Sequence, residues 1–109
     1  MKRKSITVFT PTYNRAYCIY KCYESMKRQT NKDFEWLIVD DGSSDGTDEL
    51  VKSWMNEETG FNIKYIYKEN GGMHTAYNVA YDNITTELAM NIDSDDYLTD
   101  NERLFLIPS

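Results

Sequence analysis

Short apolar runs alternate with amphipathic segments along the chain, and this alternation constrains the fold more than any other feature. Residues 5–9 (SITVF) form a run rich in β-forming residues that stops at Pro11. Residues 17–28 follow with apolar side chains at helical spacing, namely Ile19, Cys22, Tyr23 and Met26. The chain therefore begins with a predicted strand followed by a predicted helix.

The same order of strand and helix repeats to residue 92. Residues 34–40 (FEWLIVD) are mostly apolar, as expected for a strand covered on both faces. Asp48 and Glu49 suit the first turn of the helix that follows, because its N-terminal end carries partial positive charge. The elements expected after residue 28 are a strand over 34–40, a helix over 47–56, a strand over 63–67, a helix over 75–81 and a strand over 87–92.

Strands that alternate with helices pair in parallel through right-handed crossovers. We therefore expect an α/β fold, with an open, mostly parallel sheet and helices on both faces. Ligands of such sheets bind beyond the carboxyl ends of the strands. Three polar segments follow those ends and should share one edge: residues 10–15 (TPTYNR), residues 40–43 (DDGS) and residues 93–96 (DSDD).

Length and charge narrow the class of protein. The 109 residues suffice for one modest domain, and 40% hydrophobic with 28% charged residues is a globular balance. The net charge of -6 disfavours nucleic acid as a partner, because such binding depends on neutralising phosphates with cations. An acidic protein that binds an anion needs a metal ion or a helix N-terminus between them.

The sequence also bears on compartment. The basic start, Met1 to Lys4, is not followed by the uninterrupted apolar stretch of a signal peptide, and no segment approaches the roughly 20 apolar residues of a membrane span. We expect a cytoplasmic protein, with a peripheral position at the inner face of the membrane as an option. Cys18 and Cys22 lie one helical turn apart and are interpreted as reduced core thiols.

Several familiar binding loops are excluded. Residues 10–15 contain no glycine, so the dinucleotide fingerprint is missing, and a P-loop lacks its Gly-Lys-Ser/Thr. An EF-hand starting at Asp41 would place Lys52 where a bidentate glutamate is required. One starting at Asp93 would place Leu104 there.

Residues 93–96 place three carboxylates, those of Asp93, Asp95 and Asp96, directly after an apolar strand. Clustered carboxylates repel one another unless they are solvated or bind a hard cation. A solvated loop is one interpretation. The other is a Mg²⁺ or Mn²⁺ site that bridges the acidic protein to a diphosphate.

Taken together, these segments resemble the family-2 glycosyltransferases of the GT-A fold. The matching segments are residues 8–15 (VFTPTYNR), 38–47 (IVDDGSSDGT), 69–72 (ENGG) and 93–96 (DSDD). The resemblance covers nearly the whole chain and implies a Rossmann-like, nucleotide-binding fold. It also implies metal-dependent transfer of a sugar from a nucleotide-sugar donor, usually a UDP-sugar, with inversion at the anomeric carbon.

The resemblance assigns donor contacts near the first two strand ends. Pro11, Thr12 and Tyr13 would frame the base, with Tyr13 as a stacking surface, although Tyr13 packing on the strand end is the alternative. Arg15 would lie near the base or the phosphates. Asp41 would hydrogen-bond the uracil or ribose, while Asp40 either joins it or holds the loop.

Further positions follow from the later motifs. The resemblance assigns Asp93 and Ser94 to the nucleotide sugar, and Asp93, Asp95 and Asp96 to the metal. Met73 stands where relatives often carry Lys, which leaves His74 as the candidate phosphate contact. A structural or solvated His74 is the alternative.

The resemblance implies that the general base lies downstream of the Asp-X-Asp motif, so no catalytic residue is assigned here. We therefore interpret residues 1–109 as the N-terminal donor-binding part of a glycosyltransferase, with a carbohydrate or lipid-linked acceptor. The tail, residues 103–109 (RLFLIPS), would then leave an unpaired edge that favours self-association. The alternative function is a non-catalytic module that binds nucleotide sugars or self-associates.

Overall fold

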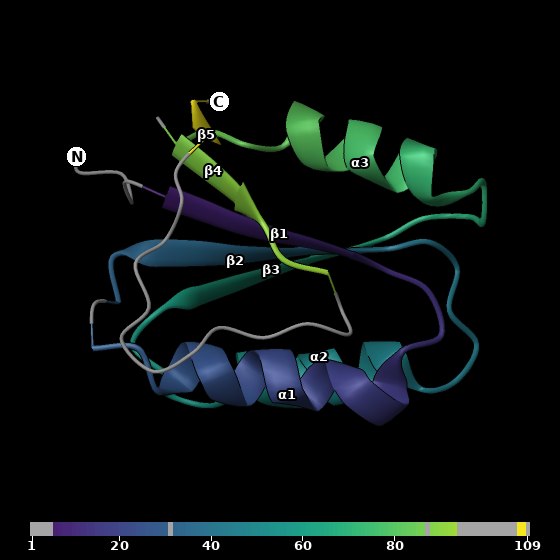
Figure 1. Cartoon of the computed structure of the whole chain (residues 1–109). Coiled ribbons are helices and arrows are strands. Elements are labelled where there is room, and N and C mark those ends of the chain that lie inside the picture. Colours follow the sequence, from purple (N-terminus) through teal and green to yellow (C-terminus); the bar gives the residue numbers. More distant parts are fainter. Residues whose placement is uncertain (1–5, 31, 87, 94–106, 109) are drawn as a thin grey trace.

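A computed structural model describes residues 6–30, 32–86, 88–93 and 107–108, and they form a sheet with helices on both sides (Figure 1). The elements, in chain order, are β1 (Ile6–Thr12), α1 (Ala16–Lys27), β2 (Phe34–Asp40), α2 (Thr47–Met55), β3 (Asn62–Tyr67), α3 (Met73–Asp82), β4 (Leu88–Asn91) and β5 (Ile107–Pro108). The sheet order is β3-β2-β1-β4-β5. β1 to β4 pair in parallel, which confirms the predicted open α/β fold.

Aromatic side chains fill the layer between the sheet and the helices α1 and α2. The rings of Tyr23 and Trp54 stack with centroids 4.2 Å apart, and Trp36 of β2 lies 5.8 Å from Trp54. Trp36 is fully buried and donates a hydrogen bond from Nε1 to Thr10 Oγ1 at 2.9 Å. Both tryptophans are core residues.

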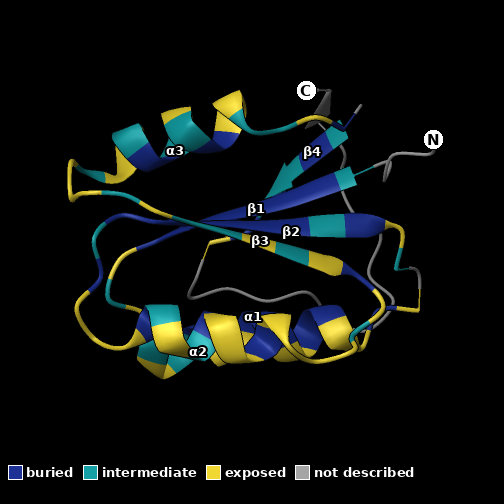
Figure 2. Cartoon of the chain, turned by 180° about the vertical axis from the view of Figure 1, so that it is seen from behind, coloured by how far each residue is buried: buried dark blue, intermediate teal, exposed yellow. Residues whose placement is uncertain are grey.

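Helix α3 alone covers the opposite face of the sheet among the described elements (Figures 1 and 2). Ala76 and Ala80 are fully buried against Phe9, Leu37 and Val39. Such small side chains let a helix approach a sheet closely. β2 is therefore covered on both faces, which explains its nearly continuous apolar sequence.

Strand β1 is longer than predicted, because Pro11 does not end it. Thr12 O accepts the Asp41 N–H at the β2 side, whereas Phe9 O accepts the Ile92 N–H at the β4 side. Backbone groups alternate along a strand, so the Pro11 nitrogen faces the β4 side. Pairing with β4 ends at Phe9, so the missing N–H of Pro11 removes no ladder hydrogen bond.

The start of α3 and the C-terminal tail differ from the sequence-based expectations. Helix α3 begins at Met73 rather than at residue 75, because Asp41 holds the two glycines that precede it, Gly71 and Gly72, by hydrogen bonds to their N–H groups. The predicted unpaired tail is corrected at Ile107–Pro108, which pair antiparallel with β4 as strand β5. The rest of residues 103–109 lies outside the described residues, as do Ser5 and Glu87 of the predicted strands.

Two other features concern the helices. Cys22 is buried, Cys18 is half-buried, and neither forms a disulfide. No helix in the described ranges is long and apolar enough to cross a bilayer.

The aromatic layer predicts the cost of a core truncation. Trp36→Ala should lower the free energy of unfolding by about 3–5 kcal/mol, because it leaves a cavity between two rings and removes the partner of Thr10. The measurement is urea unfolding followed by circular dichroism. Met55→Ala, at an exposed apolar position on α2, should change stability by less than about 0.5 kcal/mol. Equal effects of the two variants would contradict this account of the core.

Candidate functional site

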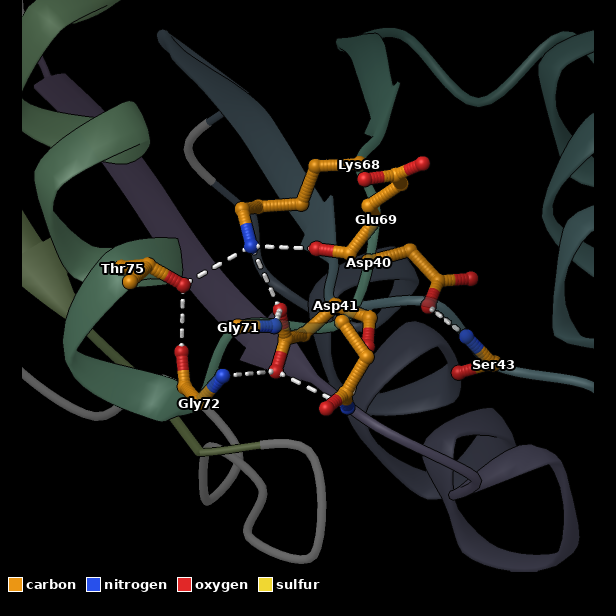
Figure 3. A network of polar contacts seen from close by, with 9 residues as sticks. Asp40, Asp41, Ser43, Lys68, Glu69, Gly71, Gly72 and Thr75 are labelled. Carbon is orange, nitrogen blue, oxygen red and sulfur yellow. Dashed lines mark hydrogen bonds and ion pairs between the residues drawn. The ribbon is translucent and has the colours of Figure 1, made fainter.

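A buried carboxylate organises the edge of the sheet where β1, β2 and β4 end. Asp41 follows β2 and is 1% exposed. Its Oδ1 accepts hydrogen bonds from Lys68 Nζ at 2.6 Å and Gly71 N at 3.0 Å, and its Oδ2 accepts one from Gly72 N at 3.0 Å (Figure 3). We call Asp41, Lys68, Asn70, Gly71, Gly72 and Thr75 the Asp41 network.

The Asp41 carboxylate is held in its charged form. Burial acts to raise its pKa, but the hydrogen bonds from Lys68, Gly71 and Gly72 outweigh burial, so the pKa of Asp41 lies below its ordinary value. Asn70 adds hydrogen bonds from Nδ2 to the Asp41 backbone O at 3.0 Å and to Oδ2 at 3.3 Å. The loop before α3 is therefore fastened to the loop after β2.

The two loops approach too closely for a side chain at residue 42. Gly42 has a φ of +85°, and a Cβ there would lie 2.8 Å from Asn70 N. Any other residue would push the loops apart. The glycine after the paired aspartates is thus required by this contact as well as by its backbone conformation.

Asp40 supports the loop from the other side. Its Oδ1 accepts the Ser43 N–H at 2.8 Å, and its Oδ2 accepts the Tyr65 hydroxyl at 2.5 Å. Burial, followed by this hydrogen bond, raises the pKa of Tyr65, so the phenol stays protonated as the donor. These contacts correspond to the loop-holding alternative for Asp40.

Asp45 joins the same loop to the starts of two helices. Its Oδ2 accepts the N–H of Ala16, the first residue of α1, at 2.9 Å. Its Oδ1 accepts the hydroxyl of Thr47, the first residue of α2, at 2.6 Å. Burial acts to raise the pKa of Asp45, but hydrogen bonds from Thr47 and Ala16 lower it on balance. One carboxylate therefore binds the first residues of both helices.

The turn after β1 is fixed against this loop. Asn14, with a φ of 52°, donates its N–H to Ser43 Oγ at 2.8 Å and accepts the Ser44 N–H on its side-chain oxygen at 2.9 Å. Tyr13 and Arg15, on either side of Asn14, remain exposed.

A cavity of about 490 Å³ opens between this turn, α3 and the end of β4. Its lining residues are Pro11, Tyr13, Asn14, Arg15, Met73, Tyr77 and Asp93. Tyr13 is 43% exposed, so much of its ring is available to a ligand. Arg15 brings positive charge and Asp93 negative charge to the same space.

Tyr77 connects α3 with the end of β4. Its hydroxyl lies 3.3 Å from Asn91 Oδ1 and 3.5 Å from Asp93 Oδ1. Burial, with the charge of Asp93 next, raises the pKa of Tyr77. The hydroxyl stays protonated and able to donate.

The structure brings four of the predicted donor residues into one cavity: Pro11, Tyr13, Arg15 and Asp93. Thr12 is buried, and its hydroxyl has no hydrogen-bond partner among the described residues. His74 is exposed on the first turn of α3, where Met73 lines the cavity instead.

Other predicted site residues lie outside the described residues, namely Ser94, Asp95 and Asp96. Within the described ranges, no three His, Cys, Asp or Glu side chains cluster closely enough to hold a metal ion. Asp93 is exposed, and its carboxylate therefore suits a hard cation in chemistry and access.

Sequence reasoning missed Lys68, Asn14 and Tyr77 as parts of the site. Lys68 is one of 12 basic residues, and its partner Asp41 lies 27 positions earlier in the chain. The only local signal was the position of Lys68 directly after a predicted strand.

The depressed pKa of Asp41 predicts a specific dependence of stability on pH. A carboxyl with a lowered pKa stabilises the fold above its unfolded-state pKa of about 3.9, and this contribution is lost as the pH falls through the lower folded-state value. Asp41→Asn should therefore cost about 3 kcal/mol at pH 7, and the difference from the unsubstituted chain should shrink below about pH 4. Urea unfolding between pH 7 and pH 3 measures this.

Asp82→Asn is the matched control, because Asp82 is exposed at the end of α3. This variant should unfold like the unsubstituted chain over the same range. A cost of Asp41→Asn that stays constant with pH would argue against the charged network.

The sequence and structure were compared with known proteins. Glycosyltransferase GlyA of Streptococcus pneumoniae is 37% identical over 93 residues, which is 85% of this chain and 13% of that protein. Staphylococcus aureus TarS 1-349 in complex with UDP-GlcNAc is 34% identical, with a TM-score of 0.76 over 85% of this chain and 27% of that one. The mannosyltransferase PcManGT from Pyrobaculum calidifontis, in complex with GDP-Man and Mn²⁺, is 27% identical, with a TM-score of 0.82 over 93% of this chain and 30% of that one.

These relatives are much longer than the chain, which spans less than a third of each of the three. The family model described as Glycosyl transferase family 2 matches residues 7–105. This match includes both the cavity and the Asp41 network. The chain belongs to glycosyl transferase family 2.

Proposed function

We propose that the protein transfers a sugar from a nucleotide-sugar donor, with a UDP-sugar as the first candidate, to an acceptor hydroxyl with inversion. The observation that carries this proposal is the cavity at the carboxyl ends of β1 and β4, where Tyr13, Arg15 and Asp93 meet. Ligands of open parallel sheets bind at such an edge. The relatives support a nucleotide-sugar donor, because TarS is in complex with UDP-GlcNAc and PcManGT with GDP-Man.

In this proposal each wall of the cavity has its own task. Tyr13 stacks on the base, which needs an exposed ring beside a rigid turn. Arg15 supplies positive charge toward the base or phosphates. Asp41 fixes the loops behind the cavity, and in this proposal it also accepts a hydrogen bond from the uracil or ribose.

The metal belongs to the same proposal. Asp93, Asp95 and Asp96 would hold Mg²⁺ or Mn²⁺, since carboxylate oxygens are the ligands that these cations prefer. When bound, the cation neutralises charge on the diphosphate as it leaves. PcManGT supports the choice of metal, because it is in complex with Mn²⁺. Ser94 lies between two of these acids and would contact the nucleotide sugar.

The proposal also covers the acceptor. We propose that residues 1–109 correspond to the donor-binding part of the longer relatives, with a carbohydrate or lipid-linked hydroxyl as acceptor. The general base that activates this hydroxyl has no assigned residue here.

Calorimetric titration of UDP into the 109-residue chain, with and without Mn²⁺, tests the metal assignment. We expect Mn²⁺ to strengthen UDP binding, and Asp95→Ala to remove this gain because one metal ligand is lost. Asp82→Ala removes an exposed carboxylate elsewhere and should bind like the unsubstituted chain. A gain in UDP affinity from Mn²⁺ that is as large in Asp95→Ala as in the unsubstituted chain would contradict the proposed metal site.

A second titration tests the stacking role of Tyr13. Tyr13→Ala should weaken UDP binding about tenfold, because stacking of a base on an aromatic ring contributes about 1–3 kcal/mol. Tyr20→Ala is the matched control, since Tyr20 is similarly exposed, at 48%, but lies on α1 outside the cavity. Unchanged affinity in Tyr13→Ala would leave Tyr13 as a residue that merely packs on the strand end.

A further inference from the structure

We propose that Lys68 is a positioning residue of the donor site, which acts through Asp41 and Thr75 on the start of α3. The inference rests on the proposed binding of a nucleotide at the cavity. It concerns a residue that lies outside the cavity lining and that no sequence motif assigned.

The contacts of Lys68 join separate parts of the chain. Its Nζ donates to Asp41 Oδ1 at 2.6 Å, to Thr75 Oγ1 at 2.8 Å and to its neighbour's backbone oxygen, Glu69 O, at 2.6 Å (Figure 3). An ammonium group has three protons, so these acceptors use all of them. Lys68 therefore has no proton left for a ligand and can influence the cavity only through its partners.

The ion pair between Lys68 and Asp41 is largely buried, so loss of one partner affects the groups that the other holds. The side chain of Asp41 is 2% exposed and that of Lys68 is 18% exposed. Removing one partner of a buried ion pair leaves the other charge without compensation, which is more disruptive than losing an exposed pair. A change at Lys68 is thus transmitted to the groups that Asp41 holds.

Those groups are the two glycines before α3. Gly72 is the N-cap of α3 but provides no side-chain cap, and Asp41 instead accepts the N–H groups of Gly71 and Gly72. Thr75 Oγ1, which accepts from Lys68, donates to Gly72 O at 2.6 Å. A Cβ at residue 71 would lie 3.1 Å from Thr75 Oγ1 and 3.3 Å from Lys68 Nζ, so the turn has little space to shift.

The first two turns of α3 carry this constraint into the cavity. Met73 follows Gly72 directly and lines the cavity, as does Tyr77 one turn later. Tyr77 in turn lies beside Asp93, 3.5 Å away. The buried Ala76 and Ala80 hold the helix on the sheet independently of Lys68, so loss of Lys68 should displace the start of α3 without releasing the helix.

The test compares Lys68→Met with Lys64→Met in the 109-residue chain. Lys64 lies exposed on β3, the strand that ends one residue before Lys68. The two variants lose the same charge and gain the same side chain. UDP affinity is measured by calorimetry at a temperature where circular dichroism shows every variant folded. We expect about a tenfold loss for Lys68→Met and no change for Lys64→Met. Lys68→Arg keeps the charge and several donors, and should recover part of the affinity.

Amide hydrogen exchange of Gly71 and Gly72 supplies a readout that does not need nucleotide. Both amides should be protected in the unsubstituted chain and in Lys64→Met, and should exchange faster in Lys68→Met. Faster exchange with unchanged UDP affinity would overturn the positioning role and leave Lys68 a structural residue, while the proposed function stands.

Two further outcomes concern UDP binding by the unsubstituted chain and folding of Lys68→Met. If the unsubstituted chain binds no UDP under any metal condition, the proposed function fails, and the positioning role fails with it even where the exchange result holds. If Lys68→Met does not fold, Lys68→Gln, which keeps hydrogen-bond donors without the charge, carries the same comparison. Affinity of Lys68→Gln equal to that of the unsubstituted chain would overturn the inference.

Discussion

The edge of the sheet depends on one buried carboxylate. Asp41 accepts hydrogen bonds from the Lys68 ammonium, from the backbone N–H groups of Gly71 and Gly72, and from the side chain of Asn70. Few side chains could satisfy that set, because a neutral amide would present an N–H to donors that need an acceptor. The loop after β2 and the start of α3 therefore take their positions from this group, and the wall of the cavity formed by Met73 and Tyr77 follows from it.

Two other carboxylates also fix loops by hydrogen bonds at this edge of the sheet. Asp45 accepts hydrogen bonds from the first residues of α1 and α2, and Asp40 accepts them from Ser43 and Tyr65. These acids fix loops through hydrogen bonds within the protein, whereas Asp93 lines the cavity at the end of β4. The acidic composition thus divides into carboxylates that build the scaffold and, as we propose, carboxylates that bind the metal and donor. Asp93 lines the cavity from the end of β4, and Arg15 lines it from the turn after β1.

Much of this architecture was predictable from local patterns, and the departures have identifiable causes. The residues of β2 were predicted to their ends, because an apolar run stops at paired aspartates. Pro11 was taken as a strand end, since sequence does not show that the neighbouring strand stops two residues earlier. The start of α3 was placed too late because the two glycines before it are held by Asp41, 30 and 31 residues earlier in the chain. Pro11, Tyr13, Arg15 and Asp93 were foreseen as neighbours from the parallel topology, whereas Lys68 could not be, since its role arises only from a long-range contact.

The central claim is that a nucleotide binds where the turn after β1, the start of α3 and the end of β4 meet. The most direct measurement is a two-dimensional NMR titration of the ¹⁵N-labelled chain with UDP and Mg²⁺, which reports every assigned amide at once. The account predicts that the largest shifts occur at Tyr13, Asn14, Arg15, Met73 and Tyr77, with small shifts along the outer face of α1 near Tyr20 and Glu24. Shifts confined to that outer face, or no shifts at saturating UDP, would contradict it.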